Sequence, residues 1–458
     1  MRRIFYCTIE TMLASQPRIG IICCFRRWAL LFFLFLMLVG GCSSPTSEAT
    51  PTPENLLLTP DVDHPTATPF QPGNGTHESP YFVPYISPSP APTSTLKPSA
   101  ITPGTPLVEL NIMPTPFPSG FEGIPIFVLS TNTNPLTGLT APNPALLERR
   151  PIAVKITQFP RLVRPQSGLT LADVVYEYYI EDGLSRFIAI FYGNDAEMAG
   201  PVRSGRFFDE HIARMYQAFF AFKFADPRVY DYYKESDLRD YMVVPTIASC
   251  PPFSLGPTDR DAYNNVFFNT AKFKDCIAKK TEINNGRPTI RSSFFSSLAP
   301  RSGLVAERIY TQYSKYDFNY WQYMPAENRY RRFQEVENQQ EGKAPSYAPL
   351  NDALTGLPVM ADNVVVIFVQ HRFANKFDEE DEVYHIDLYG SGKAFVFRDG
   401  IAVEATWNRV QLDQPILLTS ALGAPVYLKP GVTFFQVIGE TSSTWQVDTD
   451  WHFNWQAP

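Results

Sequence analysis

The chain has 458 residues and a formal net charge of −7 at pH 7, and 44% of its residues are hydrophobic. This length predicts two or three folded domains, and the hydrophobic fraction is too high for a disordered chain. The acidic balance argues against non-specific binding to nucleic acid.

Residues 1–42 are typical of a bacterial lipoprotein signal peptide. Arg26 and Arg27 precede an apolar run over 28–39, which is too short to span a bilayer as a helix. The run ends in Gly-Gly-Cys, and this order of basic, apolar and small residues before a cysteine resembles a lipobox. The resemblance implies that Cys42 carries the lipid and anchors the protein in the membrane. A plain secretory signal or a single membrane anchor is the alternative.

Residues 43–130 are predicted to be a disordered spacer rich in Pro, Thr and Ser. Residues 43–120 alone hold 18 of the 42 prolines. Such a segment cannot bury enough apolar surface to offset the entropy lost on ordering, and its prolines favour extended polyproline II conformations. It would hold the folded part away from the extracytoplasmic face of the membrane.

Residues 131–300 are expected to form the first folded domain, a mixed α/β unit. Runs rich in Val, Ile, Tyr and Phe predict strands over 151–156, 172–180 and 184–192. Asp182-Gly183 predicts a tight hairpin between the last two, which would place Tyr179 opposite Arg186.

An acidic patch is predicted on this hairpin, formed by Asp173, Glu177 and Glu181. Alternate residues of a strand share a face, so these carboxylates could line the edge of a binding groove. The pattern favours instead that Glu177 and Glu181 form cross-strand ion pairs with Arg186, which contribute little when exposed.

An amphipathic helix is predicted after the hairpin, with its apolar stripe formed by Phe208, Ile212, Met215, Phe219 and Phe222. These residues are three and four positions apart, which is the spacing of one helical face.

An anion-binding site is predicted at the start of this helix, with Ser204 as the N-cap. Arg203 and Arg206 flank the cap, and Arg186 and Arg260 are expected to contribute, because guanidinium groups near free backbone N–H groups bind carboxylate or phosphate. The alternative is that the arginines pair with acids of the chain itself, such as Asp173 or Glu181.

Cys250 and Cys276 are the two cysteines of the folded part. An extracytoplasmic address allows them to form a disulfide, and two separate buried thiols are the alternative.

Residues 301–458 are expected to form a β-rich second domain, mostly antiparallel. Strands are predicted over 304–312, 363–370, 382–389, 393–398, 401–406 and 433–438. Asp399-Gly400 predicts a hairpin that pairs Arg398 with Ile401. Residues 334–350 are expected to be an exposed insertion. Trp445, Trp451 and Trp455 either belong to the core or form a docking surface. The overall fold class is therefore α+β.

Several motifs resemble those of the YerB-like bacterial lipoproteins, which carry paired N- and C-terminal domains. The segments that carry the resemblance are 134–138, 167–169, 172–177, 183–187, 200–206, 316–317, 390–394, 399–400, 406–409 and 428–431. The stretch 260–267 departs from the family pattern, because Tyr263 and Asn264 stand where the family has Pro and His. The resemblance implies an extracytoplasmic lipoprotein and does not assign it a biochemical role.

The sequence therefore favours a non-enzymatic envelope protein that binds an anionic ligand, a cell-wall polymer or a protein partner. The alternative is an enzyme acting on an envelope glycopolymer through paired carboxylates and the arginine site. No cofactor or metal is expected: the acidic run 378–382 suits a solvated loop better than a calcium site, and the common hydrolase and zinc motifs are absent from the sequence.

Overall fold

The structure, a computed structural model, describes residues 130–458 except 258–261, 292 and 379. The predicted signal peptide, the lipidation residue Cys42, nearly all of the spacer, and Arg260 lie outside the described residues. Among the described residues, no helix is long and apolar enough to cross a membrane.

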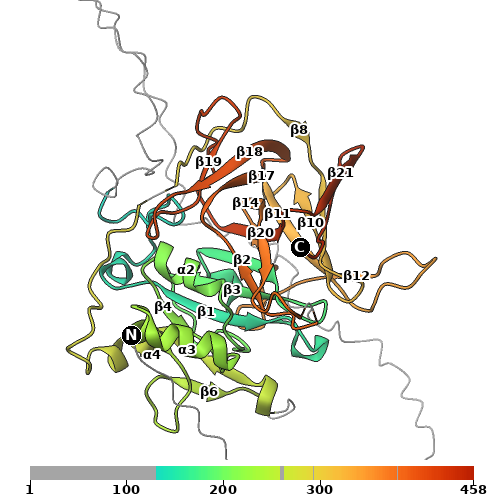
Figure 1. Cartoon of the computed structure of the whole chain (residues 1–458). Helices are drawn as coiled ribbons and strands as arrows, with labels where there is room; N and C mark the ends of the chain where they lie inside the picture. The colour runs from blue at the N-terminus through green and yellow to red at the C-terminus, as the bar shows by residue number, and fades with distance from the viewer. Residues whose placement is uncertain (1–129, 258–261, 292, 379) are drawn as a thin grey trace, which may run out of the picture. The chain divides into compact units, whose positions relative to one another are not determined.

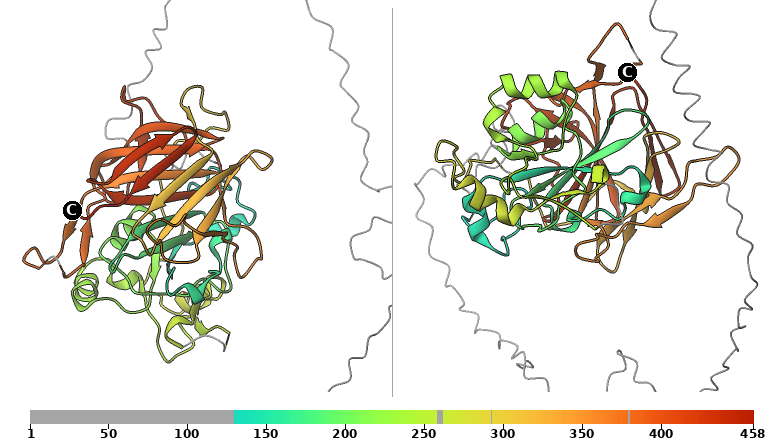
Figure 2. Two further views of the ribbon diagram at one scale, coloured as in Figure 1. Left: turned by 90° about the vertical axis from the view of Figure 1, so that its right-hand side faces the viewer. Right: turned by 90° about the horizontal axis from the view of Figure 1, so that it is seen from below.

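Two β-sheets form the central body of the described chain, which is α+β (Figures 1 and 2). The larger has eleven strands, in the spatial order β19 (Leu417–Thr419), β18 (Ile401–Arg409), β17 (Gly390–Arg398), β14 (Asn363–Val369), β20 (Thr433–Gly439), β2 (Val174–Tyr179), β3 (Ser185–Phe191), β1 (Ile152–Thr157), β4 (Phe219–Ala221) and β5 (Met242–Val243), with β8 (Leu304–Val305) beside β18. The smaller has seven, in the order β12 (Tyr347–Pro349), β11 (Arg329–Glu335), β10 (Phe318–Met324), β9 (Arg308–Gln312), β22 (Asp450–Asn454) and β21 (Ser443–Val447), with β13 (Met360–Ala361) beside β11.

The remaining elements are short. Two strand pairs lie outside these sheets, β15 (His371–Phe373) with β16 (Tyr384–Ile386), and β6 (Phe253–Leu255) with β7 (Val266–Phe268). The α-helices of the described chain are α2 (Asp209–Met215), α3 (Pro227–Glu235) and α4 (Thr270–Ile277).

One sheet runs through both of the expected domains. Strand β2 of the first segment lies parallel to β20 of the second, with Val174 opposite Thr433 and Tyr178 opposite Val437. In Figure 1 the green strands β2 and β3 accordingly continue into the orange and red strands of the C-terminal part. The backbone hydrogen bonds of the larger sheet therefore join strands from both sides of the boundary expected at residue 300.

The larger sheet is covered on both faces around β2. Tyr176 and Tyr178 point to one face, where their rings contact Phe208 at the start of α2. On the other face the smaller sheet packs against it, for example through Trp321 of β10 and Phe434 of β20, whose ring centroids are 4.8 Å apart. Residues of β2 are consequently buried along the whole strand.

Helix α2 is shorter than the apolar spacing predicts. It ends at Met215, and the chain turns at Gln217, whose φ of 48° is left-handed, into β4. Phe219 therefore lies on strand β4, not on the helix, and is buried there like the other residues of that strand. Ser204 is not the N-cap: Phe208 occupies that position and makes no side-chain cap hydrogen bond.

The two predicted hairpins differ in register. The pairing of Arg398 with Ile401 is confirmed. At Asp182-Gly183, however, Leu184 both accepts from the Ile180 amide and donates to the Glu181 carbonyl, so two residues face one. This bulge shifts the register by one residue and places Tyr178, not Tyr179, opposite Arg186.

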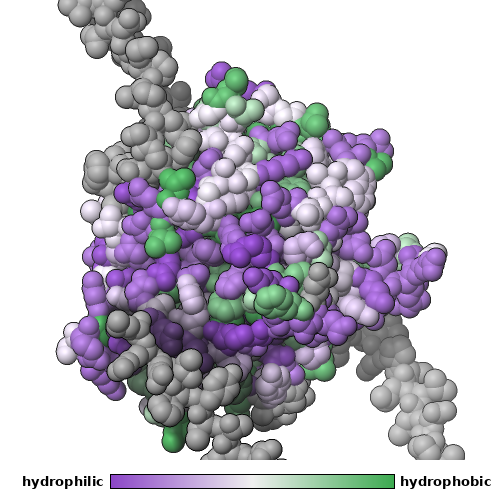
Figure 3. Space-filling model, in the orientation of Figure 1, coloured by the Kyte–Doolittle hydropathy of each residue, from purple (hydrophilic) through white to green (hydrophobic). Residues whose placement is uncertain are grey.

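The segment between β11 and β12 projects from the body in Figure 1, and its surface is hydrophilic in Figure 3. The rest of the face in Figure 3 is mainly hydrophilic, with small separate groups of apolar residues.

The structure joins Cys250 to Cys276 of α4 by a disulfide across 26 residues of sequence. We expect replacing both cysteines by serine to lower the free energy of unfolding by about 3 kcal/mol, because the unfolded chain loses a constraint. Urea unfolding would measure this, with the reduced wild type as the matched control. Equal stability of the oxidised, reduced and double-serine proteins would show that the bond does not stabilise the fold.

Candidate functional site

Glu177 is fully buried between the two sheets. Its carboxylate accepts hydrogen bonds from both terminal nitrogens of Arg332, at 2.7 and 2.8 Å, and from the side chains of Gln158 at 2.7 Å and Gln436 at 3.0 Å. Burial alone would raise the pKa of Glu177, but the charge and hydrogen bonds of Arg332 outweigh it and hold that pKa below its usual value. Glu177 therefore pairs with Arg332 and not, as the sequence suggested, with Arg186.

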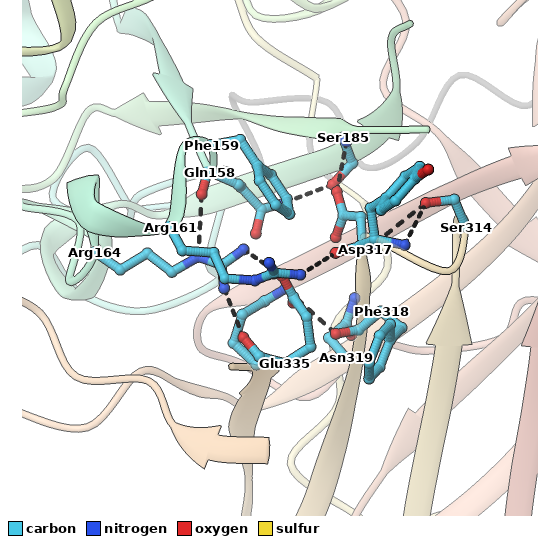
Figure 4. A network of polar contacts seen from close by, with 12 residues as sticks. Gln158, Phe159, Arg161, Arg164, Ser185, Ser314, Asp317, Phe318, Asn319 and Glu335 are labelled. Atoms are coloured by element: carbon cyan, nitrogen blue, oxygen red, sulfur yellow. Dashed lines mark hydrogen bonds and ion pairs between the residues drawn. The ribbon is translucent and has the colours of Figure 1, made fainter. Parts of the chain in front are cut away.

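Two further carboxylates lie in the same network (Figure 4). Glu335 accepts a hydrogen bond of 2.6 Å from Arg164, and Nε of Arg161 lies 3.4 Å from the same oxygen. Asp317 accepts from the Ser185 amide at 2.6 Å. Burial, reinforced by the two neighbouring carboxylates, raises the pKa of Asp317 to about 7.

The predicted acidic patch does not assemble, because each of its carboxylates has partners of its own. Asp173 accepts from the Asn134 side chain at 2.9 Å and from the amides of Tyr192 and Gly193 at 2.7 and 2.8 Å. Burial raises its pKa to about 6. Asp173 thus fixes the start of β2 against the end of β3.

Glu181 pairs with two of the predicted anion-binding arginines. It accepts from Nε of Arg206 at 2.7 Å, and Arg186 lies 3.5 Å away. Burial would raise the pKa of Glu181, but these charges lower it. Burial and the charge of Arg206 lower the pKa of Arg186 to about 9. This is the arrangement that the alternative interpretation of the arginines predicted.

The remaining members of the predicted anion site lie nearby. The Arg203 guanidinium stacks 4.3 Å from the centroid of the Tyr263 ring, and Lys223 lies 4.5 Å from the same ring. Ser204 contributes its carbonyl oxygen, which accepts a 3.1 Å hydrogen bond from Arg186. Arg186, Arg203 and Arg206 therefore lie near one another, as predicted. Helix α2, however, has less than two full turns, so its N-terminus does not provide the predicted anion site.

A second candidate site lies on the outer face of the smaller sheet. Rings from adjacent strands stack there: Trp445 on His452 at 5.0 Å, His452 on Tyr310 at 4.8 Å, and Tyr320 on Phe333 at 4.6 Å, each pair within 5° of parallel. Beside this row is a cleft of about 520 Å³, here called the aromatic cleft, lined by Tyr310, Thr311, Gln312, Phe318, Asn319, Tyr320, Gln339, Pro345, Tyr347, Trp445, His452 and Asn454.

The aromatic cleft is polar without being charged. None of the described residues that line it is Asp, Glu, Lys or Arg, and burial lowers the pKa of His452, which favours the uncharged ring. Amide and hydroxyl groups line it together with aromatic rings, and its volume suits a small ligand. Trp445 is 42% exposed at the open edge of the sheet, whereas Trp451 and Trp455 pack against the core.

Apart from Trp445, the residues of this cleft were not predicted from the sequence. Strands β10 and β11 carry Tyr320 and Phe333 and were not predicted. The concentration of aromatic residues over 318–324 was the available signal, since aromatic residues favour strands. Within the described residues, no group of three or more His, Cys, Asp or Glu side chains is placed to hold a metal ion.

Residues 136–284 match the N-terminal domain, and residues 309–435 the C-terminal domain, of the family described as "Protein of unknown function (DUF3048)". The chain belongs to this family. The resemblance to the YerB-like proteins is confirmed as well. YerB of Bacillus subtilis strain 168, a predicted lipoprotein, is 27% identical over 282 residues, which cover 60% of this chain and 78% of YerB.

The crystal structure of YerB from Bacillus subtilis shares the fold of this chain. The two superpose with a TM-score of 0.56 at 23% identity, over 67% of this chain and 96% of the YerB chain.

The buried carboxylates predict a pH dependence of stability. Asp317 stays protonated in the folded state up to about pH 7 but ionises near pH 4 once unfolded, so its contribution to stability is lost as pH rises between these values. Asp317→Asn cannot ionise. We therefore expect its stability relative to wild type to increase by roughly 1–4 kcal/mol from pH 4 to pH 8.

Urea unfolding at both pH values would measure this change. Asp413→Asn, which removes an exposed carboxylate, is the matched control and should follow the wild type. A constant difference between Asp317→Asn and wild type across this range would contradict the assignment.

Proposed function

We propose that this protein is a lipoprotein anchored at the extracytoplasmic face of the cell membrane, where it binds an envelope glycan in the aromatic cleft. Similarity to YerB, a predicted lipoprotein, supports the anchor. The order of basic residues, apolar run and Cys42 in the sequence supports it independently.

The uncharged lining of the aromatic cleft is the observation that carries the glycan proposal. Sugar hydroxyls both donate and accept hydrogen bonds, as do the side chains of Gln312, Gln339 and Asn454 in the cleft. The C–H groups of a sugar ring also pack well on aromatic faces. Trp445 offers such a face, because His452 covers one side of the indole and β21 is the last strand of the sheet.

A glycan suits the cleft better than a peptide. An extended peptide usually binds by adding a strand to an open sheet edge, where it finds backbone partners. The cleft instead lies on the face of β9 and β10, whose backbone groups pair with their neighbouring strands. A ligand there must be recognised through side chains, which are amides, hydroxyls and rings.

The arginine cluster and the acidic patch support other functions less well. Arg186 and Arg206 both pair with Glu181, and their side chains are only 9% and 13% exposed, so an anion has little access to either guanidinium. Glu177 and Asp173 are buried and fully engaged, so neither suits proton transfer to a glycopolymer.

The anchor is tested by Cys42→Ser. Without the thiol no acyl chain can attach, so we expect Cys42→Ser to lose the fatty-acid label that the wild type carries. Metabolic labelling with a fatty acid would measure this. A Cys250→Ser variant should remain labelled, and an unlabelled wild type, or label retained by Cys42→Ser, would contradict lipid anchoring at Cys42.

Glycan binding is tested by Trp445→Ala, measured by calorimetry with a neutral N-acetylglucosamine oligomer. We expect affinity to fall about tenfold, because the sugar ring loses an aromatic stacking surface. Phe377→Ala, which removes an exposed ring outside the cleft, should bind like wild type. A wild type that ignores the oligomer but binds a synthetic proline-rich peptide of residues 84–98 would show that the cleft takes peptides.

A further inference from the structure

A second hollow of about 380 Å³ lies beside the aromatic cleft. It is here called the arginine pocket and is lined by Arg161, Arg164, Gln334, Glu335, Ala348 and Pro349, among others. Lining residues of the two hollows come together at the pairing of β11 with β12. Tyr347, which lines the cleft, stands opposite Glu335, which lines the pocket.

The lining residues of the arginine pocket include more positively charged side chains than carboxylates. Two guanidinium groups converge on the single carboxylate of Glu335, Arg164 at 2.6 Å and Arg161 at 3.4 Å. The arrangement in Figure 4 shows both arginines reaching toward Glu335 from the segment after β1. One positive charge therefore remains among the lining residues of this pocket.

The two arginines are held in place by the protein. Arg164 donates from Nε to the Gln158 carbonyl at 3.0 Å and from a terminal nitrogen to the Glu335 carbonyl at 2.7 Å, and its side chain is only 11% exposed. Arg161 donates to the Tyr316 carbonyl at 2.8 Å. Both guanidinium groups also lie over the Phe159 ring, at 4.7 and 5.3 Å. Such fixed guanidiniums lose little freedom when they bind an anion.

Arg161 has donors to spare. Its Nε faces Glu335 at 3.4 Å, its guanidinium donates one hydrogen bond within the described residues, from a terminal nitrogen to the Tyr316 carbonyl, and its side chain is 29% exposed. A carboxylate or phosphate oxygen in the pocket would accept from such a group with the strength of a charge-assisted hydrogen bond. This sets the pocket apart from the neighbouring cleft, whose described lining is uncharged.

We infer that the arginine pocket receives the acidic group of a glycan whose sugar rings lie in the aromatic cleft. This inference rests on the proposed function and narrows its ligand to an anionic glycan. The acidic group is a carboxylate or a phosphate, since both suit a pair of guanidiniums.

The test compares three probes on the folded protein by calorimetry. They are a neutral N-acetylglucosamine oligomer, peptide-free peptidoglycan strands, which carry lactyl carboxylates, and a teichoic acid, which carries phosphodiesters. Wild type should bind one anionic probe at least tenfold more tightly than the neutral one, and only the anionic affinity should fall as salt is raised. The probe that gains affinity identifies the acidic group.

Arg161→Ala is the decisive variant. Its affinity for the anionic probe should fall about tenfold while its affinity for the neutral oligomer stays that of wild type, and Arg161→Lys should recover part of the loss. Arg228→Ala, which removes an ion-paired arginine elsewhere on the surface, is the matched control and should change neither affinity. Unchanged neutral binding also shows that the variant is folded.

Three outcomes would overturn the inference. Equal wild-type affinity for neutral and anionic probes would leave the glycan proposal standing and remove the role of the pocket. An equal loss of both affinities in Arg161→Ala would also remove the role of the pocket, because Arg161 would then only support the structure of the cleft. A wild type that binds none of the three probes would overturn the proposed function and the inference together.

Discussion

The ion pair between Glu177 and Arg332 is the interaction on which the rest of the structure depends. Both side chains are fully buried, 155 residues apart in sequence, and each comes from a different sheet. Removing two charges from water costs several kcal/mol per ion, and only good geometry with further hydrogen bonds offsets that cost. Here Gln158, Gln436 and Gln334 provide them, the first two to the carboxylate and the third to the guanidinium. A shift of either sheet by one residue would leave a buried charge unpaired, so the pair selects one relative placement of the sheets.

This constraint explains why the two halves of the chain act as one structural unit. Strand β2 contributes Glu177 to the interface and also pairs in parallel with β20, which contributes Gln436. A first half without the second would expose the edge of β2 and leave Glu177 without Arg332. The N- and C-terminal family matches are therefore separate segments of the sequence but not separate structural units. The larger sheet and the buried charges join them.

The sequence predicted what local chemistry determines and missed what distant contacts determine. The Asp399-Gly400 turn fixed its own register, because two residues close that hairpin. The Asp182-Gly183 turn did not, because a bulge at Ile180 and Glu181 adds a residue that no local signal announces. Glu177 was singled out as a patch residue, yet its partner lies on β11, a strand that was not predicted and whose arginine would normally be assigned to the surface. The lining of the cleft comes from β9, β10, β12, β21 and β22, so no single stretch of sequence contains it.

The buried network also reaches the candidate binding site. Gln436 donates to Glu177 and to Asn319, and it accepts a 2.6 Å hydrogen bond from Thr311. Thr311 and Asn319 both line the aromatic cleft. On the other side, Glu335 links Gln334, a hydrogen-bond partner of Arg332, to the two arginines of the arginine pocket. The floor of the cleft and the base of the pocket are therefore held by the same chain of hydrogen bonds that fixes the sheets. Such support reduces the entropy lost when a ligand orders its site, which is why a binding surface on a rigid sheet can recognise uncharged polar groups such as sugar hydroxyls.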